Sequence, residues 1–427
     1  MKNLIYLLCM VAVAVFLYSC SGDDAIFDES AADRTNAAVK EYREILYSAP
    51  NGWIMEYYAS VEPDKIGGIV FLCSFDENGN VTIASETGSG DGKYAPKDKE
   101  TSLYQVIADQ GPVLTFDTYS SLLHAYSEPK GTSQIHGMMG DYEFVMEEVT
   151  PEKIVMAGKK YGNKIVMTAM KAEQSWDSYL DDVIEMSENN YFPKYTLLIN
   201  NSEAATVSGS YDTRKCTFAQ GNEQITTENI IYTPEGFKFY NPVTIGDVTF
   251  ENFRWDAAQS SFVCTDQGAS VVLKGYYPDG YKDYQAYTGI YTFNYSDLNG
   301  AVHNLEVEVQ ELENGGSYLI AGAGDFDFVA GYNRETGRLS ITSQYITNYA
   351  SVYEIYLYNW LGGYSIDSGS SNLYEGIVTS DVPLVMEFRS NNPGSGHVGF
   401  VYIAVQGSTP YLWAEEAFFT NVVMTKK

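Results

Sequence analysis

Histidine is scarce in this chain of 427 residues, which contains four of them: His124, His136, His303 and His397. None belongs to the HExxH pattern, in which two histidines one helical turn apart hold a zinc ion. The GxSxG turn of serine hydrolases and a glycine-rich phosphate loop are also missing. These absences predict no metal and no cofactor, and they weaken the case for an enzyme.

Basic residues are few as well, because 26 Lys and Arg stand against 56 Asp and Glu. A surface with this surplus of negative charge repels phosphate backbones and anionic lipid headgroups. The sequence therefore predicts no nucleic-acid partner. It also predicts that basic side chains do not hold the protein on a membrane surface.

Five cysteines are present, and no two have the CxxC spacing of metal and redox sites. Three lie in the body of the chain: Cys73, Cys216 and Cys264. In an oxidising compartment an odd number allows at most one disulfide, for which Cys216 and Cys264 are the favoured pair because they share one segment. The alternative, which we favour, is that all three are small buried apolar side chains on strands.

The first residues have the features of a bacterial export signal. Lys2 supplies a positive start, and an apolar run over residues 4–17 follows. This run is too short for a membrane-spanning helix, which needs about 20 residues. We expect residues 1–19 to be a signal peptide that is removed.

The run ends in Leu17-Tyr18-Ser19-Cys20, which resembles the lipobox of bacterial lipoproteins, although Tyr18 is bulkier than the usual residue. The resemblance implies lipid on Cys20, which would become the new N-terminus, and a tether over residues 20–29. Several acyl chains together make membrane attachment stable, whereas one alone binds only marginally. The alternative is an ordinary secretory signal with a chance cysteine.

The next residues, Ser21-Gly22-Asp23-Asp24, resemble the acidic export tag of Bacteroidetes lipoproteins. That resemblance implies an outer-membrane location with the body exposed at the cell surface. A solvated linker on a periplasm-facing anchor is the alternative, because short acidic runs are usually solvated.

Periodicity predicts a mainly β fold with two helices. A near-complete capping box at residues 30–33 predicts the start of the first helix, which ends at Ser48. Apolar residues at helical spacing from Trp176 onward predict the second helix. Short β runs separated by turns fill the first part of the chain: 53–58, 68–75, 81–85, 103–107, 113–116, 142–149, 153–158 and 164–170.

Strands this closely spaced indicate a meander that closes into a barrel or sandwich. We expect two to three β-sandwich or lipocalin-like barrel modules, with a short N-terminal helix and one linking amphipathic helix. The predicted domains are an N-terminal β module over 30–172, the linking helix and a middle β module over 173–275, and a C-terminal β module over 276–427.

Several segments together resemble one family: 48–53 (SAPNGW), 109–117 (DQGPVLTFD), 140–144 (GDYEF), 232–237 (YTPEGF) and 253–255 (FRW). This is domain-of-unknown-function family 4302, found in Bacteroidetes lipoproteins. The family has no assigned activity. Its members are similar in setting to accessory lipoproteins that accompany outer-membrane nutrient importers.

Tyrosine is abundant, with 36 residues. Tyr favours strands, so the simple interpretation is an all-β protein. A half-exposed Tyr also offers a flat apolar ring with a polar tip, so the functional interpretation is an aromatic surface for stacking on sugar rings.

The candidate ligand-binding residues are Asp109, Asp117, Tyr119 and His124, which bring polar groups and aromatic rings together around one Pro-directed turn. The structural alternative is that residues 109–112 shape a hairpin and Asp117 caps a short helix over 119–126. A metal site could also be drawn from His124 and His136 on either side of Glu128, but loosely spaced loop residues of this kind are usually unrelated.

The leading functional hypothesis is a non-catalytic accessory protein that binds a glycan or peptide for nutrient uptake. Its expected partners are the membrane, through the lipid anchor, and an outer-membrane importer complex. One alternative is a carboxylate-dependent hydrolase, which needs two carboxyl groups across a cleft. Another is a scaffold within an envelope complex.

Overall fold

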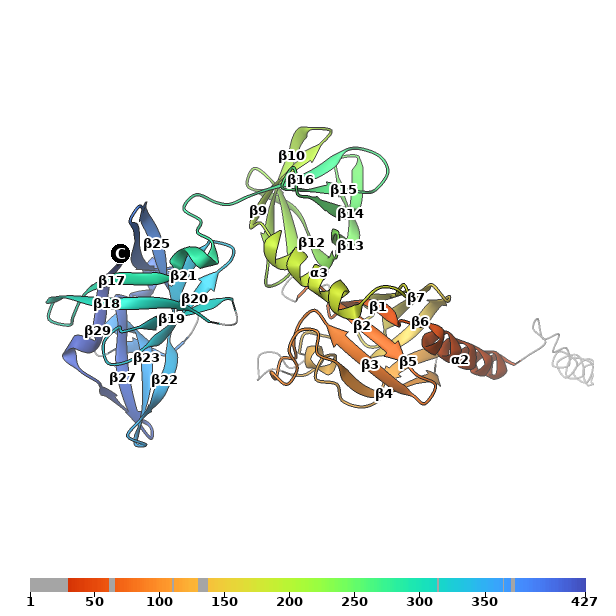
Figure 1. The fold of residues 1–427 in the computed structure, drawn as a ribbon, viewed down its shortest axis with the longest axis horizontal. Coiled ribbons are helices and arrows are strands. Elements are labelled where there is room, and N and C mark those ends of the chain that lie inside the picture. The colour runs from red at the N-terminus through yellow and green to blue at the C-terminus, as the bar shows by residue number, and fades with distance from the viewer. Residues whose placement is uncertain are drawn as a thin grey trace, which may run out of the picture. The chain divides into compact units, whose positions relative to one another are not determined.

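A computed structural model describes residues 30–60, 66–109, 111–129, 137–312, 315–363, 365–369 and 373–427. These residues form two α-helices and three barrel-like β-sheets (Figure 1). The predicted fold class, mainly β with barrel modules, is therefore confirmed. The predicted signal peptide, the predicted lipidation site Cys20 and the predicted tether lie outside the described residues.

The first sheet is an eight-stranded closed barrel. Each strand pairs with the next one along the chain, and Trp53 of β1 pairs with Ala169 of β8 to close the ring. Its strands are β1 (Trp53–Tyr58), β2 (Gly68–Phe75), β3 (Asn80–Ser85), β4 (Glu100–Ala108), β5 (Pro112–Phe116), β6 (Glu143–Val149), β7 (Lys153–Gly158) and β8 (Lys164–Ala169).

Helix α2 (Ala31–Ser48) precedes this barrel and packs on β2, β4 and β5. Ser30 caps it, since its hydroxyl accepts a hydrogen bond from the Asp33 amide at 3.1 Å. Leu46 is buried in the barrel core, and the indole of Trp53 donates to the Leu46 carbonyl at 2.8 Å. Between them Gly52 has φ +76°, and a Cβ there would lie 2.4 Å from the Cys73 carbonyl oxygen, so only glycine fits.

Helix α3 (Trp176–Asn189) follows the first barrel. It buries Tyr179, Leu180, Val183 and Met186, which share one helical face. Its first residue contacts the turn between α2 and β1, because the Trp176 indole donates to the Asn51 carbonyl at 2.9 Å. This is the amphipathic linking helix predicted from the sequence.

The second sheet is also an eight-stranded closed barrel, in which β9 pairs with both β10 and β16. Its strands are β9 (Lys194–Ile199), β10 (Ser202–Ser210), β11 (Lys215–Gln220), β12 (Glu223–Thr233), β13 (Gly236–Ile245), β14 (Val248–Asp256), β15 (Ser261–Cys264) and β16 (Val271–Tyr276).

The third sheet has 13 strands, and β29 pairs with both β17 and β26, so that eight of them form a ring. The sheet continues beyond β29 through β27 and β23 to β22, while β24 pairs with β23 and β28 pairs with β27. Its strands are β17 (Gly289–Ser296), β18 (Val302–Glu311), β19 (Ser317–Ala321), β20 (Phe328–Asn333), β21 (Arg338–Ile341), β22 (Gln344–Tyr349), β23 (Tyr353–Gly362), β24 (Ser365–Asp367), β25 (Tyr374–Asp381), β26 (Leu384–Ser390), β27 (Gly399–Gln406), β28 (Thr409–Leu412) and β29 (Phe418–Lys426).

Contacts divide the chain into two compact units, residues up to Met186 with Asn229–Tyr240, and Ser187–Glu228 with Asn241–Lys427. The first unit therefore includes, besides the first barrel, the part of the β12–β13 hairpin nearest its turn. The predicted division into three domains stays a prediction.

Many tyrosines are core residues of the third sheet. Tyr287, Tyr291 and Tyr318 are fully buried. The Tyr287 hydroxyl donates to the Gly337 carbonyl at 2.6 Å, and the Tyr291 hydroxyl donates to the Tyr287 carbonyl at 2.8 Å. Burial raises the pKa of all three phenols. For these residues the simple interpretation of the tyrosine content is correct.

Cys73, Cys216 and Cys264 are free thiols, so the predicted pair Cys216–Cys264 forms no disulfide. Cys73 and Cys216 are buried on strands, as the favoured alternative predicted. Burial raises the pKa of Cys216 to about 12 and that of Cys264 to about 11. These thiols are therefore weak nucleophiles near neutral pH.

In the part of the chain that the structure describes, neither helix combines the length and the apolar character needed to cross a bilayer.

Candidate functional site

Three of the candidate residues, Asp117, Tyr119 and His124, lie where the chain leaves β5 and turns across one end of the first barrel. The Asp117 amide donates to the Leu103 carbonyl at 2.9 Å, and the Thr118 hydroxyl accepts from the Leu103 amide at 2.8 Å. Leu122 and Leu123 then enter the barrel core, both about 2% exposed. Burial of these two side chains holds the loop against the barrel.

A buried carboxylate fixes this loop. Glu100 begins β4, is 6% exposed, and accepts hydrogen bonds from the Ser120 hydroxyl at 2.7 Å and from the amides of Ser121 and Leu122 at 3.1 and 3.2 Å. The Ser120 hydroxyl in turn accepts from the Leu123 amide at 3.1 Å. A carboxylate out of water requires such donors, so Glu100 and the loop depend on each other.

Three aromatic rings stand together on this loop and on the residue before β6. The His124 ring stacks on Tyr142 with centroids 4.7 Å apart and 24° between the planes, and it lies 5.4 Å from Tyr119. Tyr119 is 51% exposed and Tyr142 is 41% exposed. The three residues form an aromatic stack that presents ring surface to solvent.

The stack lines a pocket of about 490 Å³ at the barrel end. The remaining lining residues are mostly polar or small, with carboxylates and one lysine: Phe116, Asp117, Ser127, Glu128, Pro129, Gly140, Asp141, Glu143 and Lys160. Small-ligand sites are usually lined mostly by apolar and aromatic side chains, so this pocket has the aromatic wall of such a site but a more polar lining.

His124 is held in a defined orientation, because its Nδ1 accepts a hydrogen bond from the Ser120 amide at 3.1 Å. In the neutral ring the proton is then on Nε2, which can offer a donor to a ligand. Burial lowers the pKa of His124 below its ordinary value, and the nearby carboxylates of Glu100 and Glu128 oppose this shift only in part. The ring is therefore neutral near pH 7.

The Asp141 carboxyl has a structural role in the pocket wall. Its oxygens accept from the amides of Lys160 and Tyr161, both at 3.0 Å, which fixes the turn between β7 and β8. Burial raises its pKa, and the two amide hydrogen bonds oppose that shift. With both oxygens in use, Asp141 is poorly placed to act as an acid or base.

The structure brings together three of the four predicted site residues, since Asp117, Tyr119 and His124 line this pocket. Asp109 does not line it. It lies on the turn between β4 and β5 and forms an ion pair with Lys159 at 3.0 Å, and Lys159 also contacts Glu143 at 3.3 Å.

The alternative role for Asp117 as a helix cap is wrong. The short 3₁₀ turn covers only His124–Tyr126 and has no side-chain cap, and the preceding loop is held by Glu100 and Ser120. The Asp117 carboxylate instead accepts from the Gln105 side-chain amide. Strands β4 and β5 pair as neighbours, with Ala108 opposite Pro112 and Gly111 at φ +150°.

Sequence reasoning missed Glu100 and Tyr142. Strand β4 alternates buried and exposed positions, and Glu100 occupies a buried one together with Ser102, Tyr104 and Val106. A carboxylate at an inward position of such a strand was the available signal. Nothing local marked Tyr142, because its contact with His124 joins two distant positions of the long connection between β5 and β6.

The metal site drawn from His124, Glu128 and His136 is not tested, because His136 lies outside the described residues. Among the described residues no group of three or more His, Cys, Asp and Glu side chains is placed to hold a metal ion.

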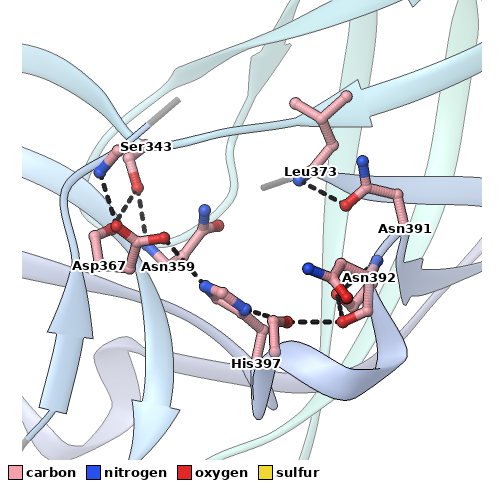
Figure 2. A network of polar contacts seen from close by, with 10 residues as sticks. Ser343, Asn359, Asp367, Leu373, Asn391, Asn392 and His397 are labelled. Atoms are coloured by element: carbon pink, nitrogen blue, oxygen red, sulfur yellow. Dashed lines mark hydrogen bonds and ion pairs between the residues drawn. The ribbon is translucent and has the colours of Figure 1, made fainter. Parts of the chain in front are cut away.

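A second polar cluster lies in the C-terminal sheet and contains Ser395, His397 and Asp367 (Figure 2). His397 Nε2 lies 3.0 Å from the Asp367 carboxylate, and Nδ1 contacts the Ser395 hydroxyl. The His397 side chain is only 3% exposed, and the Ser395 hydroxyl donates to the Asn392 carbonyl at 2.6 Å. The ring is therefore enclosed and ties the loop before β27 to β24, which is a structural role.

The sequence model of a family described as "Domain of unknown function (DUF4302)" matches residues 23–257. A second model, also described as a domain of unknown function (DUF4987), matches residues 265–382. No curated protein matches the chain.

Solved structures give only distant likenesses. A DUF3598 protein of unknown function from Nostoc punctiforme is 5% identical, covering 56% of this chain and 96% of its own, with a TM-score of 0.13. A mosquitocidal holotoxin is 10% identical over 86% of this chain and 51% of its own, with a TM-score of 0.14. The DNA polymerase III β chain of Streptococcus pneumoniae is 11% identical over 92% of this chain and 97% of its own, with a TM-score of 0.10. TM-scores this low carry no argument about fold or function.

Replacing Glu100 by Gln should destabilise the first barrel. The variant puts an amide NH₂ where the carboxylate accepts three hydrogen bonds, and bonds to a charged group contribute about 1.5–3 kcal/mol each. We expect the free energy of unfolding to fall by about 2 kcal/mol or more in urea denaturation. Glu147→Gln, the same change at an exposed position of β6, should stay within about 0.5 kcal/mol of wild type. Equal effects of the two variants would contradict the role of Glu100.

The lowered pKa of His124 should make the barrel less stable in acid. Its ordinary value is 6.5, so below that pH the unfolded chain takes up a proton that the folded ring does not, and stability falls. Between about pH 7.5 and 5.5, His124→Gln should lose less stability than wild type. We expect a difference under about 1 kcal/mol in urea denaturation, because water screens a partly exposed ring. If the stabilities of wild type and His124→Gln fall equally between these pH values, His124 does not contribute to the loss of stability in acid.

Proposed function

Since this chain belongs to the DUF4302 family, whose function is unknown, we propose from its own geometry that it is a non-catalytic binding protein for neutral glycans, held at the cell envelope by lipid on Cys20. The observation that carries the proposal is the stack of Tyr119, His124 and Tyr142 in the pocket of the first barrel.

The stack supports a ligand with both apolar and polar faces. A sugar ring has a face of C–H groups that packs on an aromatic ring and a rim of hydroxyls that need hydrogen-bond partners. Exposed tyrosines supply the packing surface with little loss of side-chain entropy, since each has two side-chain torsions. Because Glu100 and Ser120 hold the loop and its histidine in place, little ordering is needed on binding.

The charges around the stack support a neutral ligand. The carboxylates of Asp117, Glu128 and Glu143 can accept hydrogen bonds from sugar hydroxyls, and Lys160 and His124 can donate them. The same carboxylates repel phosphate, sulfate and uronate groups. A neutral polyhydroxylated ligand therefore fits this pocket better than an anionic one.

The proposed location rests on the N-terminal sequence. If residues 1–19 are removed, 56 acidic residues stand against 25 basic ones, a formal charge of −31. Such a chain does not bind anionic headgroups by charge, so lipid on Cys20 supplies the attachment. We place the body at the outer membrane, where it would pass a glycan to an importer.

Replacing Tyr119 by Ala should weaken glycan binding, because the variant removes a half-exposed wall of the stack while leaving the core intact. We expect Kd to rise about tenfold, as for aromatic contacts at other binding sites. The measurement is affinity gel electrophoresis of the full chain in detergent against dextran, galactomannan, xyloglucan and a peptide panel, followed by calorimetry with the best ligand.

Two controls accompany this variant. Tyr119→Phe keeps the ring and should bind as wild type, and Tyr276→Ala removes a 43% exposed tyrosine from β16 and should have no effect. Binding of no neutral glycan, or binding of peptides only, would overturn the proposed ligand class. Release of shorter sugars from the polysaccharide would instead support the carboxylate-dependent hydrolase and overturn the non-catalytic role.

Replacing Cys20 by Ala should release the protein into the soluble fraction, because the acylated side chain is then missing. Cys9→Ala makes the same change within the apolar run and should leave the protein with the outer membrane. The measurement is immunoblotting of soluble and membrane fractions after expression in a Gram-negative host. A Cys20→Ala protein that stays with the membrane would contradict lipid anchoring.

A further inference from the structure

A second group of exposed aromatic rings lies in the C-terminal sheet, at the ends of β22, β23 and β28. We call Tyr349, Tyr353, Tyr411 and Trp413 the aromatic strip. Tyr349 and Tyr411 are each 48% exposed, and Tyr353 and Trp413 are partly exposed. The Tyr349 and Trp413 rings lie 5.0 Å apart, and those of Tyr353 and Tyr411 lie 6.3 Å apart.

Strand register makes these rings neighbours. Tyr349 and Tyr353 are paired residues of the β22–β23 hairpin. Across the sheet, Tyr411 on β28 pairs with Ala404 on β27, and Ala404 pairs with Ile355 on β23. The small side chain of Ala404 leaves room for Tyr411 to approach Tyr353, so rings from three strands meet on one side of the sheet.

Trp413 has a fixed position. Its indole N–H donates to the Asp325 carboxylate at 2.7 Å, and its ring meets Phe326 edge-on at 4.9 Å. Phe326 belongs to a loop that the buried Tyr402 hydroxyl secures by donating to the Phe326 carbonyl at 2.6 Å. The strip thus rests on the core of the C-terminal sheet and is organised before any ligand arrives.

The hairpin that carries Tyr349 makes a strained turn. Ala350 and Ser351 have φ angles of 52° and 56°, a conformation that glycine and asparagine adopt far more readily. Strain of this kind is retained mostly where it positions functional groups. Here it positions the two residues that flank the turn, Tyr349 and Val352, and both are 48% exposed.

The segments that form the strip and its support contain no Lys, Arg or His. The segments are residues 317–333, 344–362 and 399–414. Their only charged residues are the acidic Asp325, Asp327 and Glu354. Two neutral polar residues, Gln406 and Thr409, pair two positions along from Ala404 and Tyr411 and so lie on the same face of the sheet as the rings. Aromatic rings with uncharged polar groups and carboxylates fit a neutral polyhydroxylated ligand and repel an anionic one.

We propose that the aromatic strip is a second glycan-binding site, specific for neutral sugars and separate from the pocket of the first barrel. It extends the proposed function, but it does not require the barrel pocket to bind. Two sites on one chain would also increase the avidity for a long polysaccharide relative to a short oligosaccharide.

The test uses the full chain in detergent with Tyr119→Ala, so that the barrel pocket is weakened in every sample. In this background Tyr349→Ala should reduce retardation by dextran, galactomannan or xyloglucan gels about tenfold. Tyr345→Ala is the matched control, because Tyr345 lies on the same strand, is 51% exposed, and contacts Tyr356 instead of Trp413. Trp413→Phe, which keeps a ring, should retain most of the binding.

Intrinsic fluorescence gives a second readout. Sugar stacking on the strip should change the Trp413 emission in the Tyr119→Ala chain, and Trp413→Phe should remove that change. Equal binding by the Tyr349→Ala and Tyr345→Ala chains would overturn the strip as a site, as would binding of polylysine in preference to neutral glycans. A third outcome is that Tyr119→Ala alone has no effect and Tyr349→Ala abolishes binding. This outcome would support glycan binding by the strip and overturn glycan binding by the barrel pocket.

Discussion

The buried carboxylate of Glu100 is the interaction on which the barrel site depends. A charged group at an inward-facing strand position costs several kcal/mol unless donors surround it. The loop after β5 supplies these donors through one hydroxyl and two backbone amides. Other loop conformations would leave the carboxylate without partners, so the charge selects the conformation that places Tyr119 and His124 beside Tyr142.

The same residue type serves two purposes in this molecule, and hydrogen bonding separates them. Tyr287, Tyr291 and Tyr318 are buried where a backbone carbonyl lies within reach of the hydroxyl, so burial leaves no polar atom without a partner. Tyr119 and Tyr349 are about half exposed. Composition alone could not distinguish the two groups, because the difference lies in the tertiary position of a carbonyl.

Much of the fold could be predicted because local signals and tertiary structure agree. The capping box at Ser30 marked the start of α2, and the helical spacing after Trp176 marked α3. Short β runs separated by turns located the strands of the first barrel. Contacts between distant segments could not be predicted: β29 pairs with β17, and the paired residues lie more than 120 positions apart in the chain.

In the candidate site too, the residues close in sequence could be predicted and their distant partners could not. Asp117, Tyr119 and His124 lie within eight residues of one another, so a single loop brings them to one pocket. Their partners come from elsewhere, since Glu100 is at the start of β4 and Tyr142 precedes β6. The capping role expected for Asp117 was wrong because the local rule took no account of a buried carboxylate from another strand, which accepts from the amides of Ser121 and Leu122 and fixes the loop.

Net charge limits how this protein can recognise a ligand. With more than twice as many acidic as basic residues, it gains no electrostatic attraction for phosphates, sulfates or anionic lipids. Stacking and hydrogen bonding remain, and both act over short distances and depend on the position of each group. Rigid support of the aromatic residues is therefore necessary at both surfaces. In the first barrel Glu100 provides it, and in the C-terminal sheet Asp325 and Phe326 provide it for Trp413. In each case a carboxylate fixes the support, and the rings are the proposed contact surface.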